Sequence, residues 1–264
     1  MNIWKERVHV FFQYKDLLAQ LVVRDIKLKY RRSFLGYCWS ILDPLLIMVV
    51  LTLIFSTMFS RDTSNYPIYL ITGRTIFSFT TEATNAAMRS IIGNTSLIKK
   101  CYVPKYIFTL AKVTSSLVNF VFSLGALVIV MIFTRTPVSI YVLFFPVLLI
   151  QIFLFCCGLG FFLAQLNVFF RDVQYIWNAV TTAWMYATPL FYPISQLDSA
   201  PAVQHFIETY NPLYYYVEQF RDIIYIRCMP DPRQVAVGFA IAIVVFVFGI
   251  LMFKKNQDRF ILYI

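Results

Sequence analysis

The stretch "VVRDIKLKYRRSFLGYCWSILDPLLIMVV", residues 22–50, begins as one of the most basic segments of the chain and ends as one of the most apolar. From residue 33 onward its one charged residue is Asp43, which Pro44 follows directly. Basic residues beside a long apolar segment are typical of a helix that enters a membrane from its cytoplasmic side. The stretch therefore predicts where the first membrane helix begins.

The composition of the whole chain also favours a membrane protein. Of its 264 residues, 59% are hydrophobic and 14% are charged, whereas a soluble domain is about 25% charged. A bilayer core about 30 Å thick needs about 20 apolar residues per helix. Six stretches meet this length: 35–59, 66–88, 106–134, 138–166, 173–193 and 234–253. We predict an all-α integral membrane protein with six transmembrane helices, an interface region over 1–34 and a tail over 254–264. The long charged region before the first stretch is unlike a cleaved signal peptide.

The positive charges predict the orientation. Of the 23 Lys and Arg, 17 lie before span one, between spans two and three or near the start of span three, between spans four and five, or after span six. Five lie in the alternate loops, and Arg74 lies inside span two. The positive-inside rule then places both termini in the cytoplasm. Because these charges flank the spans, they explain the net charge of +10 better than a nucleic-acid partner does.

The segment before span one predicts an amphipathic helix. Arg24, Lys27 and Arg31 share one side of it, which is the pattern of a helix lying in the membrane interface. The apolar residues form an opposite side and a second line near the basic side: Val22, Val23, Ile26 and Tyr30, and Leu17, Leu21 and Leu28, respectively. The second line indicates either a docking face for another protein or one amphipathic helix on anionic lipid.

Span two has a polar stripe along one helical face: Arg74, Ser78, Thr81, Glu82, Asn85 and Arg89. An Arg at the centre of a span costs about 2.5–3.5 kcal/mol on insertion scales, so the stripe must face protein or water. A conduit and an internal hydrogen-bonded seam both satisfy this requirement. Trp184 and Tyr186 lie deep in span five, and we predict that they line the same conduit.

Pro44 removes the helical hydrogen bond to the carbonyl of Ser40, which predicts a kink in span one. Asp43 either braces that kink or faces the conduit, and we favour bracing. Gly36 permits a turn from the basic segment into the span.

The outside segment before span six is long and rich in aromatic residues, with "YNPLYYYVEQFRDIIYI" at 210–226. Asn211 and Pro212 are typical of a helix N-cap and first turn. Six apolar residues then fall on one face: Leu213, Tyr216, Val217, Phe220, Ile223 and Ile224. We predict a segment that re-enters the membrane or lies on it, with an ordinary folded loop as the alternative.

Motifs for catalysis are missing. The sequence has no GxxxxGK phosphate loop, no HExxH and no GxSxG. Its five cysteines form no CxxC pair and its two histidines are far apart, so we expect neither a metal site nor enzymatic activity.

Uphill transport would need an ion gradient or a separate ATPase. Asp43 and Glu82 are the clear acids within the spans and no internal repeat is evident, which favours a separate ATPase. A short basic helix between spans two and three would then receive its motion.

Four pieces, in this order, resemble the membrane subunit of ABC-2-type polysaccharide exporters, the family of O-antigen, capsule and teichoic acid transporters. They are "KYRRSFLGYCWSILDPLL" (29–46), "NTSLIKKCYVPKYIFTLAKV" (94–113), "LNVFFRDVQYI" (166–176) and "TPLFYPISQL" (188–197) with "YNPLYYYVEQFRD" (210–222). The resemblance covers nearly the whole chain. It implies a permease in a bacterial inner or cell membrane that pairs with a second copy and two cytoplasmic ATPase subunits. A lipid-linked polysaccharide would then cross between the two permeases.

The resemblance also implies roles for particular residues. The ATPase-coupling residues would be Arg24, Lys27, Arg31, Ser96, Leu97, Ile98, Lys99 and Lys100. The outer gate, formed by a re-entrant region at about 194–228 and the residue before it, would include Pro193, Asn211, Pro212, Tyr214 and Tyr215. ATP and magnesium would bind the partner ATPase, and this chain would bind no cofactor. The alternatives are an ABC-2 permease for drugs or lipids, and an ion-coupled carrier or channel without an ATPase.

Overall fold

The computed structural model describes residues 13–31, 33–59, 65–100 and 103–263, and all regular structure within them is helical. The α-helices are α2 (Lys15–Tyr30), α3 (Trp39–Phe59), α4 (Tyr66–Met88), α5 (Thr95–Lys100), α6 (Tyr106–Phe133), α7 (Phe145–Phe169), α8 (Val173–Tyr186), α9 (Pro201–Tyr210), α10 (Pro212–Arg221) and α11 (Pro232–Asn256). Short 3₁₀ turns precede α3, α5, α7 and α9 and follow α11, and a π-helical turn, Asp222–Ile226, follows α10.

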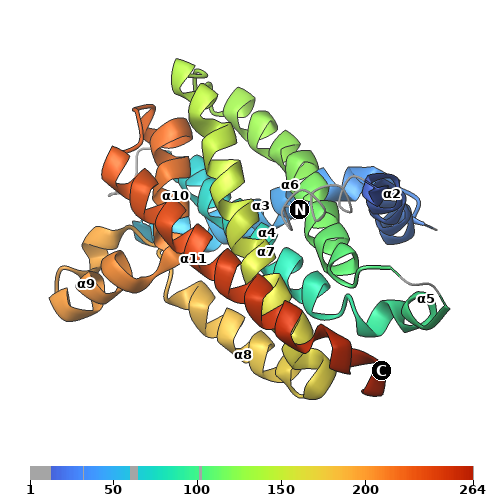
Figure 1. Cartoon of the computed structure of the whole chain (residues 1–264). Coiled ribbons are helices and arrows are strands. Elements are labelled where there is room, and N and C mark those ends of the chain that lie inside the picture. The colour runs from blue at the N-terminus through green and yellow to red at the C-terminus, as the bar shows by residue number, and fades with distance from the viewer. Residues whose placement is uncertain (1–12, 32, 60–64, 101–102, 264) are drawn as a thin grey trace.

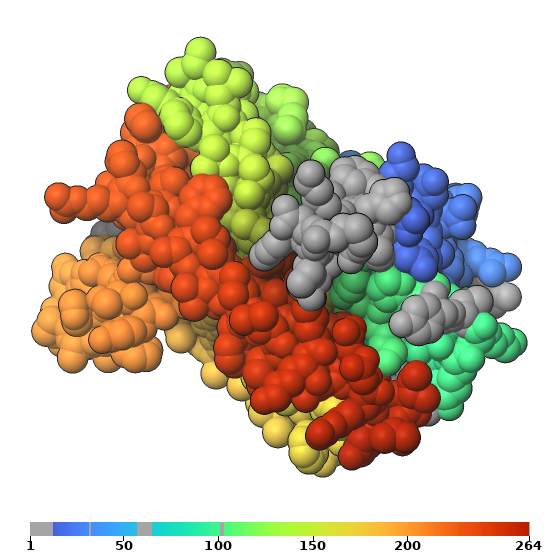
Figure 2. All heavy atoms as spheres, viewed as in Figure 1, coloured from blue at the N-terminus to red at the C-terminus, as the bar shows by residue number. Residues whose placement is uncertain are grey.

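The helices surround α4. Helices α3, α6, α7 and α10 pack against it, and α11 packs against α7. Figure 1 shows α2, α5 and the C-terminus at one end of the bundle, and α9 and α10 toward the other. In the space-filling view, α11 crosses one face of the molecule and α9 projects beside it (Figure 2). The basic segments gather at the end that holds α5, so the two ends of the bundle differ in charge.

Among the described residues, four helical segments are long and apolar enough to cross a membrane: Gly36–Ser56, Tyr106–Phe133, Ile140–Phe169 and Pro232–Leu262. They coincide with predicted spans one, three, four and six. The chain is a multi-pass membrane protein. Helix α4 is 23 residues long and more polar than these four, and most of its residues are buried in the bundle. Its position explains how a polar helix avoids contact with lipid.

Predicted span five is a shorter helix than expected. Helix α8 has 14 residues and ends at Tyr186, so it is about 21 Å long, short of a bilayer core of about 30 Å. A continuous helix over 173–193 was therefore a wrong prediction. Pro189 and Pro193 follow α8, and a proline disfavours helical geometry at the residue before it. The chain continues beyond α8 as irregular backbone.

Helix α2 packs against the bundle of its own chain. Leu21 and Val22 are buried, and the helix packs against α6. Leu28 and Val23 are exposed, although they belong to the two different apolar lines of the sequence. Each line thus has buried and exposed members. The role of the second line, as a docking face for another protein or as part of one amphipathic helix on anionic lipid, stays a prediction. The side of α2 that faces the bundle depends on the angle at which α2 packs against α6. Helical periodicity does not specify this angle. The basic side remains outward, along a groove of about 600 Å³ that Arg24, Lys27 and Arg31 help to line.

The chain turns from α2 into α3 at Gly36, which has φ +50°, a conformation that favours glycine. Helix α3 then runs as one helix through Pro44.

Helices α7 and α11 touch at backbone level. A Cβ atom added at Gly249 would lie 2.0 Å from the carbonyl oxygen of Gly158, and one at Gly158 would lie 2.5 Å from the carbonyl of Val245. Such close approach needs small residues in the interface of membrane helices. The pair therefore depends on glycine at both positions.

We predict that Gly249→Val sharply lowers the amount of folded protein. The added atoms meet backbone, so the cost should exceed the about 1–3 kcal/mol of ordinary overpacking. The measurement is the yield of monodisperse protein extracted from membranes. Gly93→Ala is the control, because nothing lies within 4 Å of its added Cβ. A normal yield of Gly249→Val would contradict the close packing.

Candidate functional site

The polar stripe of α4 is the accessible side of an otherwise buried helix. Ser78 and Arg89 are exposed, and Arg74, Thr81, Glu82 and Asn85 are partly buried. On the opposite side Ile76 and Ala83 are fully buried. The apolar residues of α4 thus pack against neighbouring helices and leave the stripe along two cavities.

The first cavity, of about 230 Å³, lies between α4 and helices α2, α3 and α6, and Arg74, Ser78 and Glu82 help to line it. One oxygen of Glu82, Oε1, lies 2.8 Å from Nζ of Lys29. The same oxygen accepts a hydrogen bond of 2.8 Å from Nδ2 of Asn119. At Glu82 the stripe is therefore a hydrogen-bonded seam between helices.

The second cavity, of about 360 Å³, lies between α4 and α8. Its wall includes Ser78 and Thr81 from the stripe and Thr182 and Met185 from α8. Arg74 reaches across to Met185, with Nη1 3.4 Å from Sδ. The wall therefore combines hydroxyl groups with apolar side chains and the charged residues Arg74 and Glu82. At Glu82 the stripe is thus a seam, and at Ser78 it is accessible. The conduit stays a prediction.

Asp43 and Pro44 of α3 both line the first cavity, opposite Arg74 of α4. Asp43 is an exposed residue. Of the two roles considered for this carboxylate, its position favours facing the cavity over bracing the helix at Pro44. Asp43 and Arg74 put charges of opposite sign on two walls of the same space.

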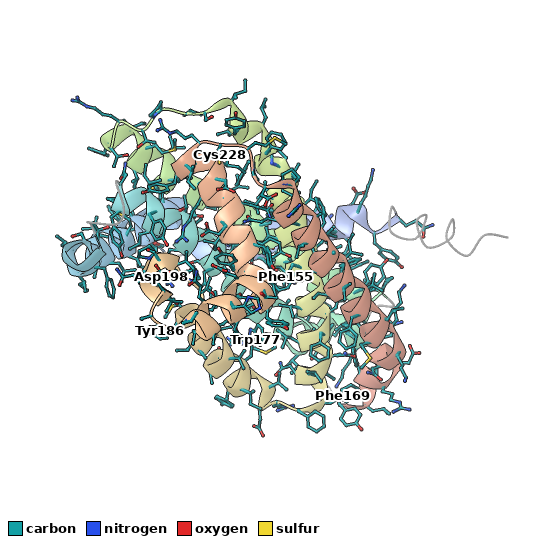
Figure 3. The ribbon with its side chains drawn as sticks, turned by 90° about the vertical axis from the view of Figure 1, so that its left-hand side faces the viewer. Phe155, Phe169, Trp177, Tyr186, Asp198 and Cys228 are labelled. Atoms are coloured by element: carbon teal, nitrogen blue, oxygen red, sulfur yellow. The ribbon has the colours of Figure 1, made fainter. Side chains whose placement is uncertain are left out.

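The two aromatic residues predicted to line the conduit have different surroundings. Trp184 does not line either cavity: its Nε1 donates a hydrogen bond of 2.8 Å to Oδ1 of Asn211. The ring of Trp184 also contacts those of Phe155 and Trp177. A buried indole N–H needs an acceptor, and Asn211 supplies one. Tyr186 at the end of α8 is 64% exposed (Figure 3).

The irregular backbone after α8, residues 187–193, is held by α4. Tyr66 donates from its hydroxyl to the carbonyl of Phe191 at 2.7 Å, and Tyr69 donates to the carbonyl of Tyr192 at 2.8 Å. Non-helical backbone at membrane depth is tolerated only where protein or water satisfies its polar groups. The two tyrosines therefore make this break in the helix possible.

Asn211 holds the same segment from the other side. Its Nδ2 donates to the carbonyl of Ala187 at 3.0 Å and to the hydroxyl of Thr188 at 3.0 Å. Its Oδ1 also accepts from the backbone N–H of Leu213, which confirms Asn211 as the N-cap of α10. One side chain thus begins α10 and fixes the end of α8.

Arg221 lies at the centre of this arrangement and is 2% exposed. Its Nη2 donates to the carbonyl of Pro189 at 2.7 Å, and its Nη1 pairs with Glu218 at 2.9 Å. The guanidinium lies 3.6 Å from the ring centroid of Tyr69, in reach of a cation–π interaction. We call Arg221, Asn211, Tyr66 and Tyr69 the carbonyl clasp, because together they bind the carbonyl groups of 187–193.

Sequence reasoning missed Arg221 as a functional residue and counted it among outside charges. The spacing along the sequence indicated its position, because Arg221 follows Val217 by four residues and Leu213 by eight. It therefore lies on the buried face of α10. All six apolar residues predicted for that face are buried, which confirms the amphipathic interpretation of this segment. The other gate candidates, Pro193, Pro212, Tyr214 and Tyr215, are partly buried around it.

The end of the bundle with α5 carries the predicted coupling residues. The expected short helix is present as α5, Thr95–Lys100. Leu97 is 38% exposed, whereas Ile98 is 8% exposed and packs against the core. Ser96, Lys99 and Lys100 are exposed beside Leu97. Helix α5 thus presents one exposed apolar side chain among polar ones. Figure 1 shows α5 at one edge of the molecule.

The C-terminal 3₁₀ turn, Gln257–Leu262, is fixed to the same end. Lys105 donates from Nζ to the carbonyl of Gln257 and lies 5.7 Å from the ring centroid of Phe260. Burial lowers the pKa of Lys105, and the negative charge of Asp258 partly offsets this effect. The start of α6 and the end of the chain are thereby held together.

Comparison with known proteins decides the family. The family model of the ABC-2 type transporter matches residues 16–225, which include α2, the stripe, α5 and the carbonyl clasp. This chain belongs to the ABC-2 type transporter family. The ABC-2 family match confirms the resemblance seen in the sequence.

Individual relatives of this ABC-2 protein are similar over most of their length. An O-antigen export system permease protein RfbA of Myxococcus xanthus is 30% identical, over 96% of this chain and 97% of the relative. A protein of the same name from Klebsiella pneumoniae is 29% identical over 93% of each chain. The capsule polysaccharide export inner-membrane protein CtrC of Neisseria meningitidis serogroup A is 26% identical over 78% of each.

Proposed function

We propose that this chain is the permease subunit of an ATP-driven exporter that moves a lipid-linked polysaccharide across the bacterial inner membrane. The observation that carries the proposal is the accessible polar stripe of α4, in a chain whose relatives along nearly its full length are O-antigen export permeases. Hydroxyl, amide and aromatic groups suit sugars, which are rich in hydrogen-bonding groups. A separate ATPase subunit supplies the energy.

The conduit forms between two copies of the chain. Within α8, Thr181 alone is buried, and Tyr175 and Ile176 are 68% and 62% exposed. The exposed Ser78 of α4 lies on the same cavity as α8. A second permease against this side would cover α8 and turn the open wall into an enclosed path. The carbonyl clasp would hold the outer end of that path.

Motion reaches the path from the cytoplasm. ATP binding draws two ATPase subunits together, and they press on α5 and on the basic side of α2. Because α2 and α3 are joined through the turn at Gly36, and α5 follows α4, both of these contacts lead to helices that line the first cavity. A polymer advances by such steps over repeated ATP cycles.

Reconstitution tests the proposed function. The permease is co-expressed with its ATPase subunit, and the complex is purified and placed in vesicles with lipid-linked polysaccharide. ATP-dependent movement of polymer to the opposite side is the expected result. Isolation of the chain from native membranes without any ATPase, together with ion-driven transport or ion currents, would contradict it.

Ser78→Trp is expected to block export. The indole would fill much of a cavity of about 360 Å³, and Ser78 is exposed, so the substitution does not disturb buried packing. Polysaccharide at the cell surface is measured, together with the amount of permease in the membrane. Ser78→Ala, which keeps the space open, is the control. Unchanged export by Ser78→Trp would mean that the polymer does not pass this wall.

A further inference from the structure

An ionic junction around one nearly buried carboxylate links α2 to neighbouring helices. Asp25 of α2 has a side chain that is 9% exposed. Its Oδ1 lies 3.1 Å from Nη2 of Arg24, and its Oδ2 lies 3.0 Å from Nζ of Lys112 in α6. One carboxylate therefore compensates two cations, one on its own helix and one on α6.

The junction continues to the base of α5. Nη2 of Arg24 also donates to Oδ1 of Asn94 at 3.0 Å, and Nδ2 of Asn94 donates to the carbonyl of Ser90 at 2.8 Å. Asn94 is 4% exposed and directly precedes Thr95, the first residue of α5. A continuous polar network thus runs from α6 through Asp25 and Arg24 to the start of α5.

Asp25 balances the positive charges at this junction. A groove of about 420 Å³ at the junction is lined by Arg24, Arg89 and Lys112, and Asp25 is the one acidic residue among the described residues that line it. Removal of one partner from a buried ion pair leaves an uncompensated charge, which costs far more than the pair contributes when it is intact. Without Asp25, the cations would repel each other and α2 would separate from the base of α5.

We propose that Asp25 is a positioning residue that joins α2 to α5 through Arg24 and to α6 through Lys112. The two cytoplasmic helices then move as one body when the ATPase presses on either of them. This inference rests on the proposed function for its consequence in transport. The joint itself is a property of the chain. If α2 and α5 moved separately, every cycle would break contacts between buried polar groups.

The test in the complex is Asp25→Asn, which keeps the shape of the side chain and removes its charge. In the reconstituted permease with its ATPase, export per ATP hydrolysed is expected to fall about tenfold or more, because one partner of a buried pair is lost. The rate of hydrolysis should change little. Asp16→Asn is the matched control, since Asp16 is exposed on the first turn of the same helix. An unchanged ratio of export to hydrolysis in Asp25→Asn would overturn the proposal.

Lys112→Gln tests the pair from its other side. It should reproduce the loss, and the double variant with Asp25→Asn should be no worse than the more impaired single variant, because both remove the same joint. Independent, additive losses would overturn the assignment of this pair.

A second readout does not depend on transport. Hydrogen exchange of the backbone amides at residues 92–100 should become faster in Asp25→Asn and remain unchanged in Asp16→Asn. Unchanged exchange in Asp25→Asn would overturn the joint, even if this variant exported less polymer. Conversely, absence of polymer export by the unmodified complex would contradict the proposed function and leave this measurement valid.

Discussion

Replacement of Arg221 by leucine is expected to abolish export and to lower the thermal stability of the protein. Leucine removes the donor to the carbonyl of Pro189 and leaves Glu218 without its partner. The loss of one member of a buried ion pair costs about 3–5 kcal/mol, which is a large part of the stability of a typical domain. We therefore expect the largest stability effect of any single charge removal at the end of the bundle that holds α9 and α10.

The experiment compares three variants in detergent and in cells. Arg221→Leu should show a clear fall in melting temperature and little polysaccharide at the surface. Arg221→Lys keeps the charge but not the planar guanidinium, which both bonds Pro189 and stacks on Tyr69, so its effect should be intermediate. Arg233→Leu, at an exposed position on α11, is the control. Wild-type stability and export in Arg221→Leu would show that the carbonyl clasp is not needed.

Leu97→Asp is expected to uncouple ATP hydrolysis from export. Leu97 is the exposed apolar residue of α5, and a carboxylate there would have to be desolvated against the partner subunit. Ile98, which packs against the core, is unchanged. The permease should therefore fold and reach the membrane while polymer export falls to background.

Hydrolysis and export are measured in the same complex. Continued hydrolysis without export indicates that the contact transmits motion, and loss of the ATPase on purification indicates that it also holds the subunits together. Leu97→Met, which preserves an apolar contact, should export normally. Normal export by Leu97→Asp would refute the assignment of α5 as the coupling helix.

Local patterns predicted much of this architecture. The apolar lengths predicted four of the membrane helices, because the cost of exposing polar groups to lipid depends on local composition. The cap at Asn211, the apolar face of α10 and the short helix α5 also followed from residues close together in sequence. The polar stripe was evident from helical spacing alone.

The same patterns did not specify how the helices meet. For α2, helical periodicity identified two apolar lines but not the side of the helix that packs against α6. For Trp184, composition suggested a conduit, whereas an acceptor on Asn211, 27 residues later, determined the direction of the indole. Asp43 was assigned to the helix kink, and its neighbours across the first cavity became known only from the packing of α3 against α4.

The sequence by itself determined a helical membrane protein, its main spans, the polar face of α4 and the family resemblance, because hydrophobic length, helical spacing and capping act over short distances along the chain. Only the tertiary structure decided that α8 ends early, that Arg221 and two tyrosines bind the carbonyl groups beyond it, and that Asp25 joins α2 to α5. These features depend on buried polar groups, whose partners are chosen by proximity in space. A buried carbonyl or carboxylate requires a partner, but the sequence does not state which distant residue supplies it.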